Sequence, residues 1–594
     1  MKKLLQILPI ALLLAGCGKQ QPKNEAIKDQ QVQVEQAGEI DPSAGEGAKQ
    51  GGTYSAWGGP FPKSLNMWLD YNSFSLQVTG LMFQPLIDLH STEDRPIGLL
   101  ADSWEISPDK MTFTFKISPD AKWSDGQPVT AEDVQFYYDV IMDPKNQTSL
   151  FRVDMGRFDR PKVIDEKTVS ITAHEVHWKN FWTAGGFYAF PKHAWKDANF
   201  NELNFTTQYP VVNGPYALEE VKIDRSVKLV RRGDWWGRVR KYNLNKFNFD
   251  HIVFKSMEDQ AKALENLKKE EFDSYAIYSS KIWVKDTLDP SFEQVQKNWI
   301  ARQAVYNDLP RGFQGFAMNM RRPIFQDVRV RQALACLLNR ELMNEKLMFN
   351  QYFLLNSYFP DIYPNYTNPD IPITKYDPDK ARALLKEAGW QPGADGVLTK
   401  DGQPFSIKFL YEAEGDMRHL NIYLEDLKSV GIQASVDQVS ESTLSERVDH
   451  YNFDILWRSW QAVRLDDPET MWSSKQADEV AGQNICGLKD PEVDALIDQQ
   501  KTEFDAGKRK DILKKIDARL MALCPYVLMW EANDVRLLYW NRFGTPKYVL
   551  SKYGDESDAL EYWWFDPDKS KALDDARQKG AALPALPAEV HYQE

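Results

Sequence analysis

The stretch WSDGQPVTAEDV, residues 123–134, predicts a tight turn that leads directly into a helix. An Asp-Gly pair at residues 125–126 favours the turn. Thr130 stands where the hydroxyl of an N-cap residue is needed, and Asp133 follows three residues later as its capping-box partner. We therefore expect a helix to begin at about Ala131.

Residues 100–106 and 111–117, just upstream, alternate apolar and polar side chains. A Ser-Pro-Asp turn at residues 107–109 separates the two runs, which is the pattern of two half-buried strands. Strand, turn and helix signals thus follow one another within about 40 residues.

Helix signals recur in the second half of the chain. Asp327 is a suitable N-cap, and the apolar residues that follow it fall on one helix face: Val330, Ala333, Leu334, Leu337 and Leu338. Residues 377–389 have an N-cap Asp, a Pro at the first helical position and a Gly at the end, which marks both ends of a helix.

Residues 397–436 alternate between strand and helix patterns. They predict a hairpin at 397–405, a buried strand at 406–410, a helix at 422–430 and a strand at 432–436. Alternation of this kind is typical of a wound α/β lobe.

The N-terminus has the pattern of a secretion signal. Two lysines precede an apolar run at residues 4–15, which is shorter than a membrane-spanning helix and suits a signal peptide over residues 1–16. The residues before Cys17 resemble a lipobox, in which the cysteine is lipidated; the alternative is an ordinary signal peptide with a chance cysteine. Residues 17–50 are then a lipidated, disordered tether, because residues 18–50 have almost no large apolar side chains.

Composition limits the classes of partner. The chain has 594 residues and a net charge of −14, which argues against nucleic acid and anionic membrane surfaces as partners. About 540 residues follow the tether, so two or three domains are expected. Nineteen Trp and 25 Tyr leave aromatic side chains available for cavity walls.

Three cysteines remain after Cys17. Cys336 falls on an apolar helix face and is expected to be a buried thiol. Cys486 and Cys524 either form a disulfide in an oxidising envelope or stay apart, and the sequence leaves both open.

Several of these stretches resemble the family-5 extracellular solute-binding proteins, the peptide and oligopeptide receptors of bacterial ABC importers. The resemblance is carried by residues 100–134, by VVNGPY at 211–216 and by FAMNMRRPIFQDVRVRQAL at 316–334, and it extends over nearly all of residues 51–565. It implies an α/β fold of the periplasmic-binding-protein type, class II, in its large three-domain form, with a ligand cleft between two lobes.

The resemblance also implies the division of the chain. Lobe I takes residues 51–90, 206–312 and 534–594, with 566–594 as a surface tail; an extra α/β subdomain takes 91–205; and lobe II takes 313–533. The hinge is expected near residues 213–216 and 309–319.

The expected function is capture of a peptide or oligopeptide between the lobes and its delivery to the permease and cytoplasmic ATPases of an ABC transporter. The protein would be a monomer on the periplasmic or cell-envelope side, anchored by lipidated Cys17, with no cofactor, metal or catalytic residue. Residues 312–358 and 454–460 look most like the branch that takes up longer peptides and the peptide-nucleotide antibiotic microcin C.

Other classes stay open as alternatives. The same fold binds sugars, haem or metal complexes in some family members, and a lipoprotein glycoside hydrolase would need two carboxylates across a cleft. The sequence has no phosphate-cradling loop, no G-x-S-x-G and no Cys pair at zinc spacing. HEVH at residues 174–177 is one residue short of a metalloprotease motif and lies in an alternating run, so surface strand histidines are expected there.

By resemblance, ligand contacts should centre on residues 454–470 of lobe II and on the loop at residues 57–61 of lobe I. The candidate ligand-binding residues are Trp57, Phe61, Asn319, Trp457, Arg458, Trp460, Asp466 and Asp467.

The resemblance also suggests how a peptide amine is read. In family members, a Trp after this strand is followed by an acid that pairs with the α-ammonium of the peptide. Trp460 fits the Trp, but Val463 stands where the acid would fall. Either Asp466 or Asp467 takes that role, or Arg458 engages a carboxylate or carbonyl instead, or Asp467 merely caps a helix that begins at Glu469.

Overall fold

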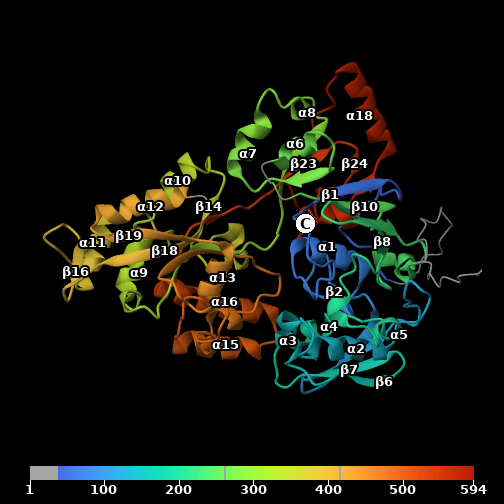
Figure 1. The fold of residues 1–594 in the computed structure, drawn as a ribbon, viewed down its shortest axis with the longest axis horizontal. Coiled ribbons are helices and arrows are strands. Elements are labelled where there is room, and N and C mark those ends of the chain that lie inside the picture. Colours follow the sequence, from blue (N-terminus) through green and yellow to red (C-terminus); the bar gives the residue numbers. More distant parts are fainter. Residues whose placement is uncertain (1–37, 258, 260–261, 414–416, 594) are drawn as a thin grey trace, which may run out of the picture.

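A computed structural model describes residues 38–593, apart from 258, 260–261 and 414–416. Two lobes stand side by side, and an extra α/β subdomain lies beside lobe I and reaches toward lobe II (Figure 1). No helix in the described part of the chain is both long and apolar enough to cross a membrane.

Lobe I contains two four-stranded sheets. The first has the order β1-β10-β9-β8, with β1 parallel to β10, and the second has the order β11-β23-β12-β26. Their strands are β1 (Thr53–Gly59), β8 (Tyr216–Lys222), β9 (Ser226–Arg231), β10 (His251–Ser256), β11 (Ser274–Ala276), β12 (Ile300–Tyr306), β23 (Val535–Trp540) and β26 (Glu589–His591). The helices are α1 (Ser73–Met82), α6 (Ala263–Lys268), α7 (Ser280–Val284), α8 (Glu293–Gln296), α17 (Asp558–Tyr562) and α18 (Pro567–Lys579). Short pairs are β2 (Ile87–Leu89) with β3 (Pro96–Gly98), and β24 (Phe543–Gly544) with β25 (Trp564–Phe565).

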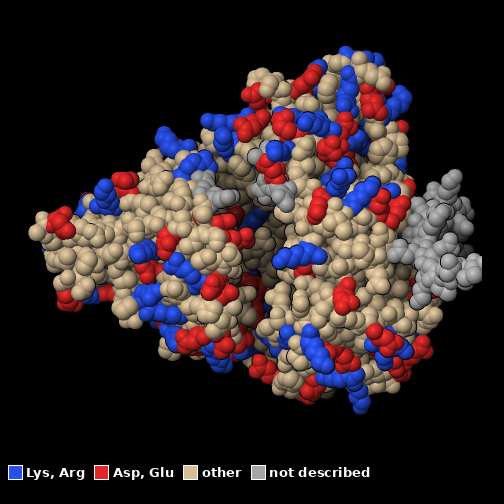
Figure 2. All heavy atoms as spheres, viewed as in Figure 1, with Lys and Arg blue, Asp and Glu red and all other residues tan. Residues whose placement is uncertain are grey.

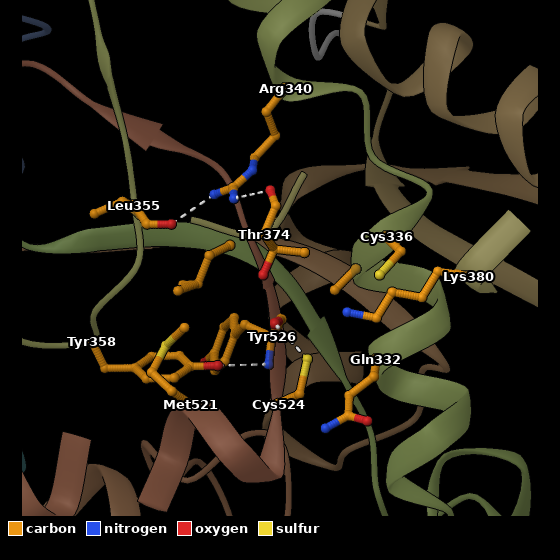
Figure 3. Close-up of a pocket in the computed structure, with 12 residues that line it drawn as sticks. Gln332, Cys336, Arg340, Leu355, Tyr358, Thr374, Lys380, Met521, Cys524 and Tyr526 are labelled. Atoms are coloured by element: carbon orange, nitrogen blue, oxygen red, sulfur yellow. Dashed lines mark hydrogen bonds between the residues drawn. The ribbon is translucent and has the colours of Figure 1, made fainter. Parts of the chain in front are cut away.

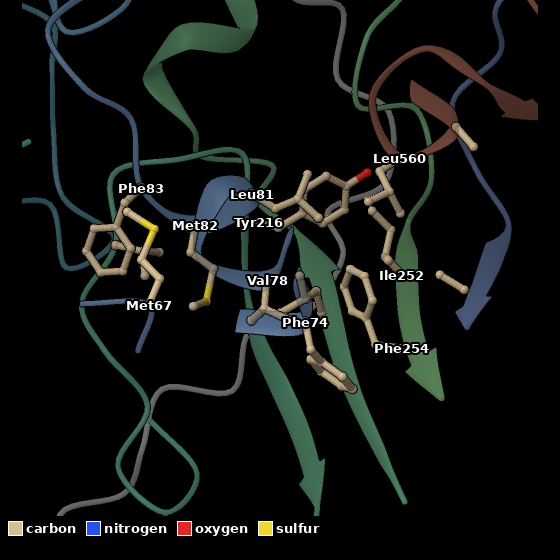
Figure 4. Close-up of a cluster of buried hydrophobic side chains, with 14 of the residues drawn as sticks. Met67, Phe74, Val78, Leu81, Met82, Phe83, Tyr216, Ile252, Phe254 and Leu560 are labelled. Carbon is tan, nitrogen blue, oxygen red and sulfur yellow. The ribbon is translucent and has the colours of Figure 1, made fainter. Parts of the chain in front are cut away.

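Helix α1 packs on the first sheet of lobe I through a continuous apolar face. Figure 4 shows Phe74, Val78 and Leu81 of this helix beside Tyr216 and Phe254 of the strands. The helix begins where Asn72 caps it, because its side chain accepts the N–H of Ser75. This core fixes the loop that follows β1.

The subdomain is an antiparallel sheet, β4-β5-β7-β6, covered by helices. Its elements are β4 (Ala101–Ile106), β5 (Thr112–Ile117), β6 (Lys162–Asp165), β7 (Thr168–Thr172), α2 (Ala131–Met142), α3 (Ser149–Met155), α4 (Asn180–Gly185) and α5 (Lys192–Trp195). The two predicted strands and the helix start at Ala131 are confirmed. The Asp133 carboxylate accepts the Thr130 N–H at 2.9 Å and the Trp123 indole N–H at 3.2 Å, so it joins the turn to the helix.

Lobe II is a five-stranded mixed sheet, β19-β18-β20-β13-β21, with helices on both faces. Its strands are β13 (Phe313–Met318), β18 (Ser406–Glu412), β19 (Gln433–Val439), β20 (Ile455–Trp460) and β21 (Tyr526–Leu528). Its helices are α9 (Val328–Cys336), α10 (Arg340–Lys346), α11 (Pro378–Glu387), α12 (Arg418–Ser429), α13 (Glu441–Asp449), α14 (Glu469–Trp472), α15 (Pro491–Lys501) and α16 (Ala506–Leu523). Smaller strands are β14 (Phe353–Leu354), β15 (Gln391–Pro392), β16 (Leu398–Lys400), β17 (Gln403–Pro404) and β22 (Trp530–Glu531).

The predicted helices of lobe II begin and end close to their sequence signals. Asp327 caps α9 by accepting the Arg329 N–H at 3.0 Å, and Asp377 caps α11. Gly389 has φ +93°, the left-handed conformation that a helix stop requires. Helix α12 begins at Arg418, four residues before the predicted start at 422. No N-cap side chain marks its first turn, so this start has no signal in the sequence.

The chain crosses between the lobes at residues 307–312, after β12, and at residues 532–534, after β22. The expected hinge segment at 213–216 lies elsewhere: Asn213 is fully buried in lobe I, where its Oδ1 accepts the Gln84 N–H at 2.7 Å. The second crossover is therefore residues 532–534, which include the turn-forming pair Asn533-Asp534.

The expected disordered tether is too long at its C-terminal end. Asp41 is 1% exposed, and its carboxylate contacts Lys246 Nζ at 2.9 Å, Ser91 Oγ at 2.5 Å and the Tyr562 hydroxyl at 3.1 Å. Gly45 packs against the ring of Trp564. Residues 41–45 therefore belong to lobe I, held by a buried ion pair that compositional arguments overlook. Cys17 and residues 1–37 lie outside the described residues.

The alternative of a Cys486–Cys524 disulfide is wrong, because both thiols are free and buried. Cys524 belongs to the core on one face of the lobe II sheet, and Cys486 belongs to the core on the other face. Each thiol donates to a different carbonyl, Cys486 to Pro525 at 3.4 Å and Cys524 to Tyr526 at 3.6 Å. Cys336 is a buried thiol, as predicted.

The C-terminal residues are mostly exposed, as expected, but two segments pack on lobe I. Helix α18 places Leu573 and Ala576 in the lobe I core, and β26 pairs in parallel with β12. The Ala/Pro-rich sequence before β26 has no strand pattern, so only the edge of β12 explains why this segment is extended.

Candidate functional site

A cavity with a volume of about 660 Å³, here called the larger cavity, opens between the lobes, where the surface is hollowed (Figure 2). Most of its wall comes from lobe I: strand β1 and the loop after it, the start of α1, strand β11 and the segment before α17. Glu441, at the start of α13, is the contribution of lobe II. A cavity of this size at a domain interface is typical of a ligand site.

Strand β1 and its loop place two aromatic side chains in this wall. Trp57 and Phe61 both line the cavity, so the structure brings these two predicted residues together. The Trp57 indole N–H donates to the Met257 carbonyl at 3.3 Å, and its ring meets the Tyr275 ring edge-on at 5.4 Å. Gly58 must lack a side chain, because a Cβ there would lie 2.4 Å from the ring of Phe74.

The lobe II residues of the predicted site lie apart from this cavity. Trp457 is 42% exposed and donates its indole N–H to Gln314 Oε1 at 3.3 Å. Trp460 is half-buried and donates to the Tyr526 hydroxyl at 2.9 Å. Arg458, between them on β20, makes no hydrogen bond or ion pair with the described residues. Of these side chains, Trp457 and Arg458 stay available to a ligand.

Asn319 belongs to the scaffold of lobe II. It is 1% exposed, and its amide nitrogen donates to the carbonyls of Tyr451 and Phe453, both at 2.9 Å. Its Oδ1 accepts from Arg321 at 3.1 Å. The side chain therefore ties β13 to the turn before β20, and it presents no free polar group to a ligand.

Asp467 is buried where lobe II meets the subdomain. Its Oδ1 accepts from Gln500 Nε2 at 3.0 Å and from the Glu469 N–H at 3.2 Å, although the N-cap residue of α14 is Pro468. Its Oδ2 lies 3.3 Å from Nε2 of His177, which is also buried. These contacts, His177 first among them, outweigh the cost of burial and lower the pKa of Asp467 to about 2.

Asp466 faces the same subdomain. Its Oδ1 accepts the Asp467 N–H at 2.9 Å, and burial raises the pKa of its carboxyl, an effect that Lys179 of the subdomain partly offsets. Neither acid lines the larger cavity. Asp467 thus contacts the subdomain, and the carboxyl of Asp466 is influenced by the charge of Lys179 there.

The expectation of surface strand histidines is wrong, because neither residue lies in a strand and only His174 is at the surface. Strand β7 ends at Thr172; His174 is exposed beside Asp159, whereas His177 turns inward to Asp467. Trp178 continues this contact: its indole N–H donates to Gln500 Oε1 at 2.7 Å, and its backbone N–H donates to the Lys501 carbonyl at 2.9 Å. Subdomain and lobe II are therefore joined by buried hydrogen bonds.

One group among the described residues has the spacing of a metal site: His177, Asp467 and Glu469, whose ligand atoms lie within 4.8 Å of one another. The proton positions oppose this use. Nδ1 of His177 accepts the Lys179 N–H at 3.0 Å, so the proton of the neutral ring sits on Nε2, the atom that a metal would need. Lys501 already pairs with Glu469. We assign the group to the contact between the subdomain and lobe II.

The smaller cavity, of about 200 Å³, lies within lobe II (Figure 3). Arg340 projects into it, but its guanidinium donates to the carbonyls of Leu355 at 2.7 Å, Met529 at 3.0 Å and Thr374 at 2.8 Å. Burial lowers the pKa of this group to about 10. With its donors directed at backbone, Arg340 holds lobe II together.

Comparison with known proteins identifies the family of this chain. Residues 95–481 match the family described as bacterial extracellular solute-binding proteins, family 5. The chain belongs to this family. It is a solute-binding protein of the extracellular or periplasmic class that works with an ABC transporter.

Relatives of this family-5 protein include a probable peptide-binding protein, YejA, of Agrobacterium fabrum, which is 27% identical over 82% of this chain and 85% of its own. The oligopeptide-binding protein AppA of Bacillus subtilis is 22% identical over 94% of this chain and 97% of its own. The AppA structure, solved with a nonapeptide, superposes with a TM-score of 0.68 at 21% identity, covering 87% of this chain and 99% of its own. NikA of Brucella suis, solved with Fe(III)-EDTA, has a TM-score of 0.70 at 19% identity, covering 85% and 99%. These structures establish the two-lobed α/β fold.

Sequence reasoning missed several residues of the cavity wall and of the contact with the subdomain. Tyr275, Tyr278, Glu441 and Glu556 line the cavity, and His177 joins the subdomain to lobe II. The acidic run at residues 555–558, close to the aromatic run at 562–565, was the one local sequence pattern that could have indicated Glu556 as a residue of the cavity wall. Glu441 reads as an ordinary first-turn helix residue, so only the fold shows its position.

Proposed function

We propose that this protein captures peptides in the cavity between its lobes and passes them to an ABC permease, without covalent chemistry. The observation that carries this proposal is the cavity of about 660 Å³, which has aromatic walls and residues from both lobes. Peptide-binding relatives over most of the chain support the substrate class.

The contact between the subdomain and lobe II supports a closing mechanism. In a two-lobed receptor, ligand shifts the population toward the closed form, because some contacts exist only there. We assign this role to the buried contact of His177 with Asp467 and to the hydrogen bond of Trp178 to Gln500. Trp57 and Phe61, with Trp457 and Arg458 on the opposite lobe, are the side chains we assign to the ligand.

A second candidate is a non-peptide solute. NikA, with the same fold, was solved with a metal chelate, and nothing in the cavity wall restricts it to peptides. Native mass spectrometry of protein purified without refolding separates the two, since a trapped ligand has the mass of a peptide or of a metal complex.

The direct test is thermal unfolding of refolded, ligand-free protein with a mixed peptide digest. A peptide receptor gains stability by RT ln(1 + [L]/Kd), which is about 2.7 kcal/mol at a hundredfold excess over Kd. Stabilisation by metal chelates or sugars, but by no peptide, contradicts the proposal. Steady hydrolysis of peptides or glycosides contradicts the non-enzymatic part.

We further propose a lipid anchor on Cys17 and a monomeric receptor, from the lipobox-like sequence. A preference for longer peptides or a peptide-nucleotide stays a prediction from the likeness of residues 312–358 and 454–460 to that branch.

A further inference from the structure

We infer that the larger cavity holds a positively charged group of the ligand, an α-ammonium or the side chain of Lys or Arg, against Glu556. This inference rests on the proposed function and adds the chemical class that the cavity selects. It is carried by the charge, the hydrogen bonding and the aromatic walls of the cavity.

Acidic side chains outnumber basic ones in the cavity wall. Asp70, Glu441 and Glu556 line it, against the single cation Lys63. The Asp70 carboxylate already accepts the backbone N–H groups of Lys63 at 2.8 Å and Ser64 at 3.3 Å. Glu441 and Glu556 are then left to act on a ligand, and they come from opposite lobes.

Glu556 lacks a cationic partner among the described residues. Its Oε1 accepts a hydrogen bond of 2.5 Å from the hydroxyl of Tyr278, which is 73% exposed and lines the same cavity. Burial raises the pKa of the Glu556 carboxyl, and the charge of Asp555 raises it further. A cation beside Glu556 would lower this pKa again, since an opposite charge favours the ionised carboxylate.

The walls around Glu556 also suit a cation. Trp57, Tyr275 and Tyr278 line the cavity, and aromatic faces attract ammonium and guanidinium groups. The ring of Trp57 is fixed by its hydrogen bond to Met257 and by its edge-on contact with Tyr275. A positive group in this cavity can therefore contact aromatic rings as well as the carboxylate of Glu556.

The experiment compares pentapeptides by isothermal titration calorimetry: one with a central Lys and a free amine, one acetylated, one with norleucine for Lys, and one with both changes. Glu556→Gln should weaken binding of the cationic peptides by roughly ten- to a hundredfold, the range expected for a hydrogen bond to a charged group. It should change the affinity for the doubly modified peptide less than about twofold. Glu105→Gln is the matched control, because that exposed carboxylate on β4 makes the same change in charge and is not part of the cavity wall.

The peptide arms identify the source of the charge. If acetylation weakens binding to the wild type but not to Glu556→Gln, then Glu556 binds the α-ammonium. If norleucine in place of Lys weakens binding to the wild type but not to Glu556→Gln, then Glu556 binds the side chain. Equal affinities for all four peptides, unchanged by Glu556→Gln, overturn the inference and leave the peptide function standing.

Cadaverine, a simple diamine, separates the two proposals. If no peptide binds but cadaverine stabilises the wild type and not Glu556→Gln, the cation site stands and the peptide function fails. If neither peptides nor cadaverine bind, both fail.

Discussion

Nε2 of His177, in the subdomain, lies 3.3 Å from Oδ2 of Asp467, in lobe II, and both side chains are buried. The Lys179 N–H fixes the ring tautomer, so that Nε2 is the donor in this contact. A buried carboxylate that loses such a donor keeps its desolvation cost. The pair therefore favours the arrangement in which the subdomain and lobe II touch.

Removing either partner should weaken ligand binding, because closure then gains less free energy. We expect His177→Ala and Asp467→Asn each to raise Kd by roughly tenfold, and the double variant to be no weaker than the worse single one, since both remove one shared contact. Calorimetry with one peptide measures this. His174→Ala, on the same segment but exposed beside Asp159, is the control and should bind like the wild type. Strictly additive losses would contradict the pairing.

The same pair predicts an acid limit. The Asp467 pKa is lowered from 3.8 to about 2, so its stabilisation is complete above pH about 4 and is lost as pH falls through 2. As the pH is lowered from 5 to 2, the melting temperature should fall less steeply for Asp467→Asn than for the wild type.

Trp178→Phe should loosen the subdomain while keeping most of the apolar contact. The substitution removes the indole N–H that donates to Gln500 at 2.7 Å, at a cost of about 1 kcal/mol. Hydrogen exchange of helix α15, which contains Gln500, should become faster. Trp104→Phe is the control, because that indole, also in the subdomain, packs on Phe181 and makes no hydrogen bond with the described residues. Unchanged exchange in α15 would argue against a role for this bond.

Asp558 should make the protein less stable as pH rises toward neutrality. Burial raises the pKa of this carboxyl from 3.8 to about 7. The contribution of a carboxyl with a raised pKa to the free energy of unfolding is complete below pH about 4 and is lost as the pH rises to about 7. The free energy of unfolding then falls by at most about 1.4 kcal/mol per pH unit. Between pH 4 and pH 7, the melting temperature of Asp558→Asn should change less than that of the wild type. Asp574→Asn, an equal charge change at an exposed position of α18, should not; equal slopes for all three proteins would refute the assignment.

All three cysteines after residue 17 should be free. Alkylation in denaturant without reductant, followed by mass spectrometry, is expected to modify Cys336, Cys486 and Cys524 fully. The native protein should react slowly, because burial raises the pKa of Cys486 and of Cys524 to about 12. A mass two units low that reductant restores would reveal a disulfide.

Cys17→Ser should release the protein from membranes. Lipidation requires the thiol, and the attached lipid chains would hold the protein at a bilayer. Cell fractionation and immunoblotting measure the partition, with Cys336→Ser as the control for loss of a cysteine elsewhere. Persistence of Cys17→Ser in the membrane fraction would exclude this anchor.

Local signals predicted local structure well. The caps at Thr130, Asp327 and Asp377 specify helices within a few residues of themselves, so their starts could be read from the sequence. The contact of His177 with Asp467 could not, because it joins residues distant in sequence whose meeting depends on how the lobes pack. The burial of Asp41 was hidden for the same reason: its partner Lys246 lies in another segment.

The pairing of β26 with β12 has a practical consequence for the design of expression vectors. Tyr592 donates its backbone N–H to the Tyr306 carbonyl at 2.8 Å, and His591 stacks on the Tyr306 ring at 4.5 Å, directly before the crossover at residues 307–312. An affinity tag fused after this strand would therefore sit beside a segment that joins the two lobes. A purification handle that replaces residues 1–17 leaves that segment untouched.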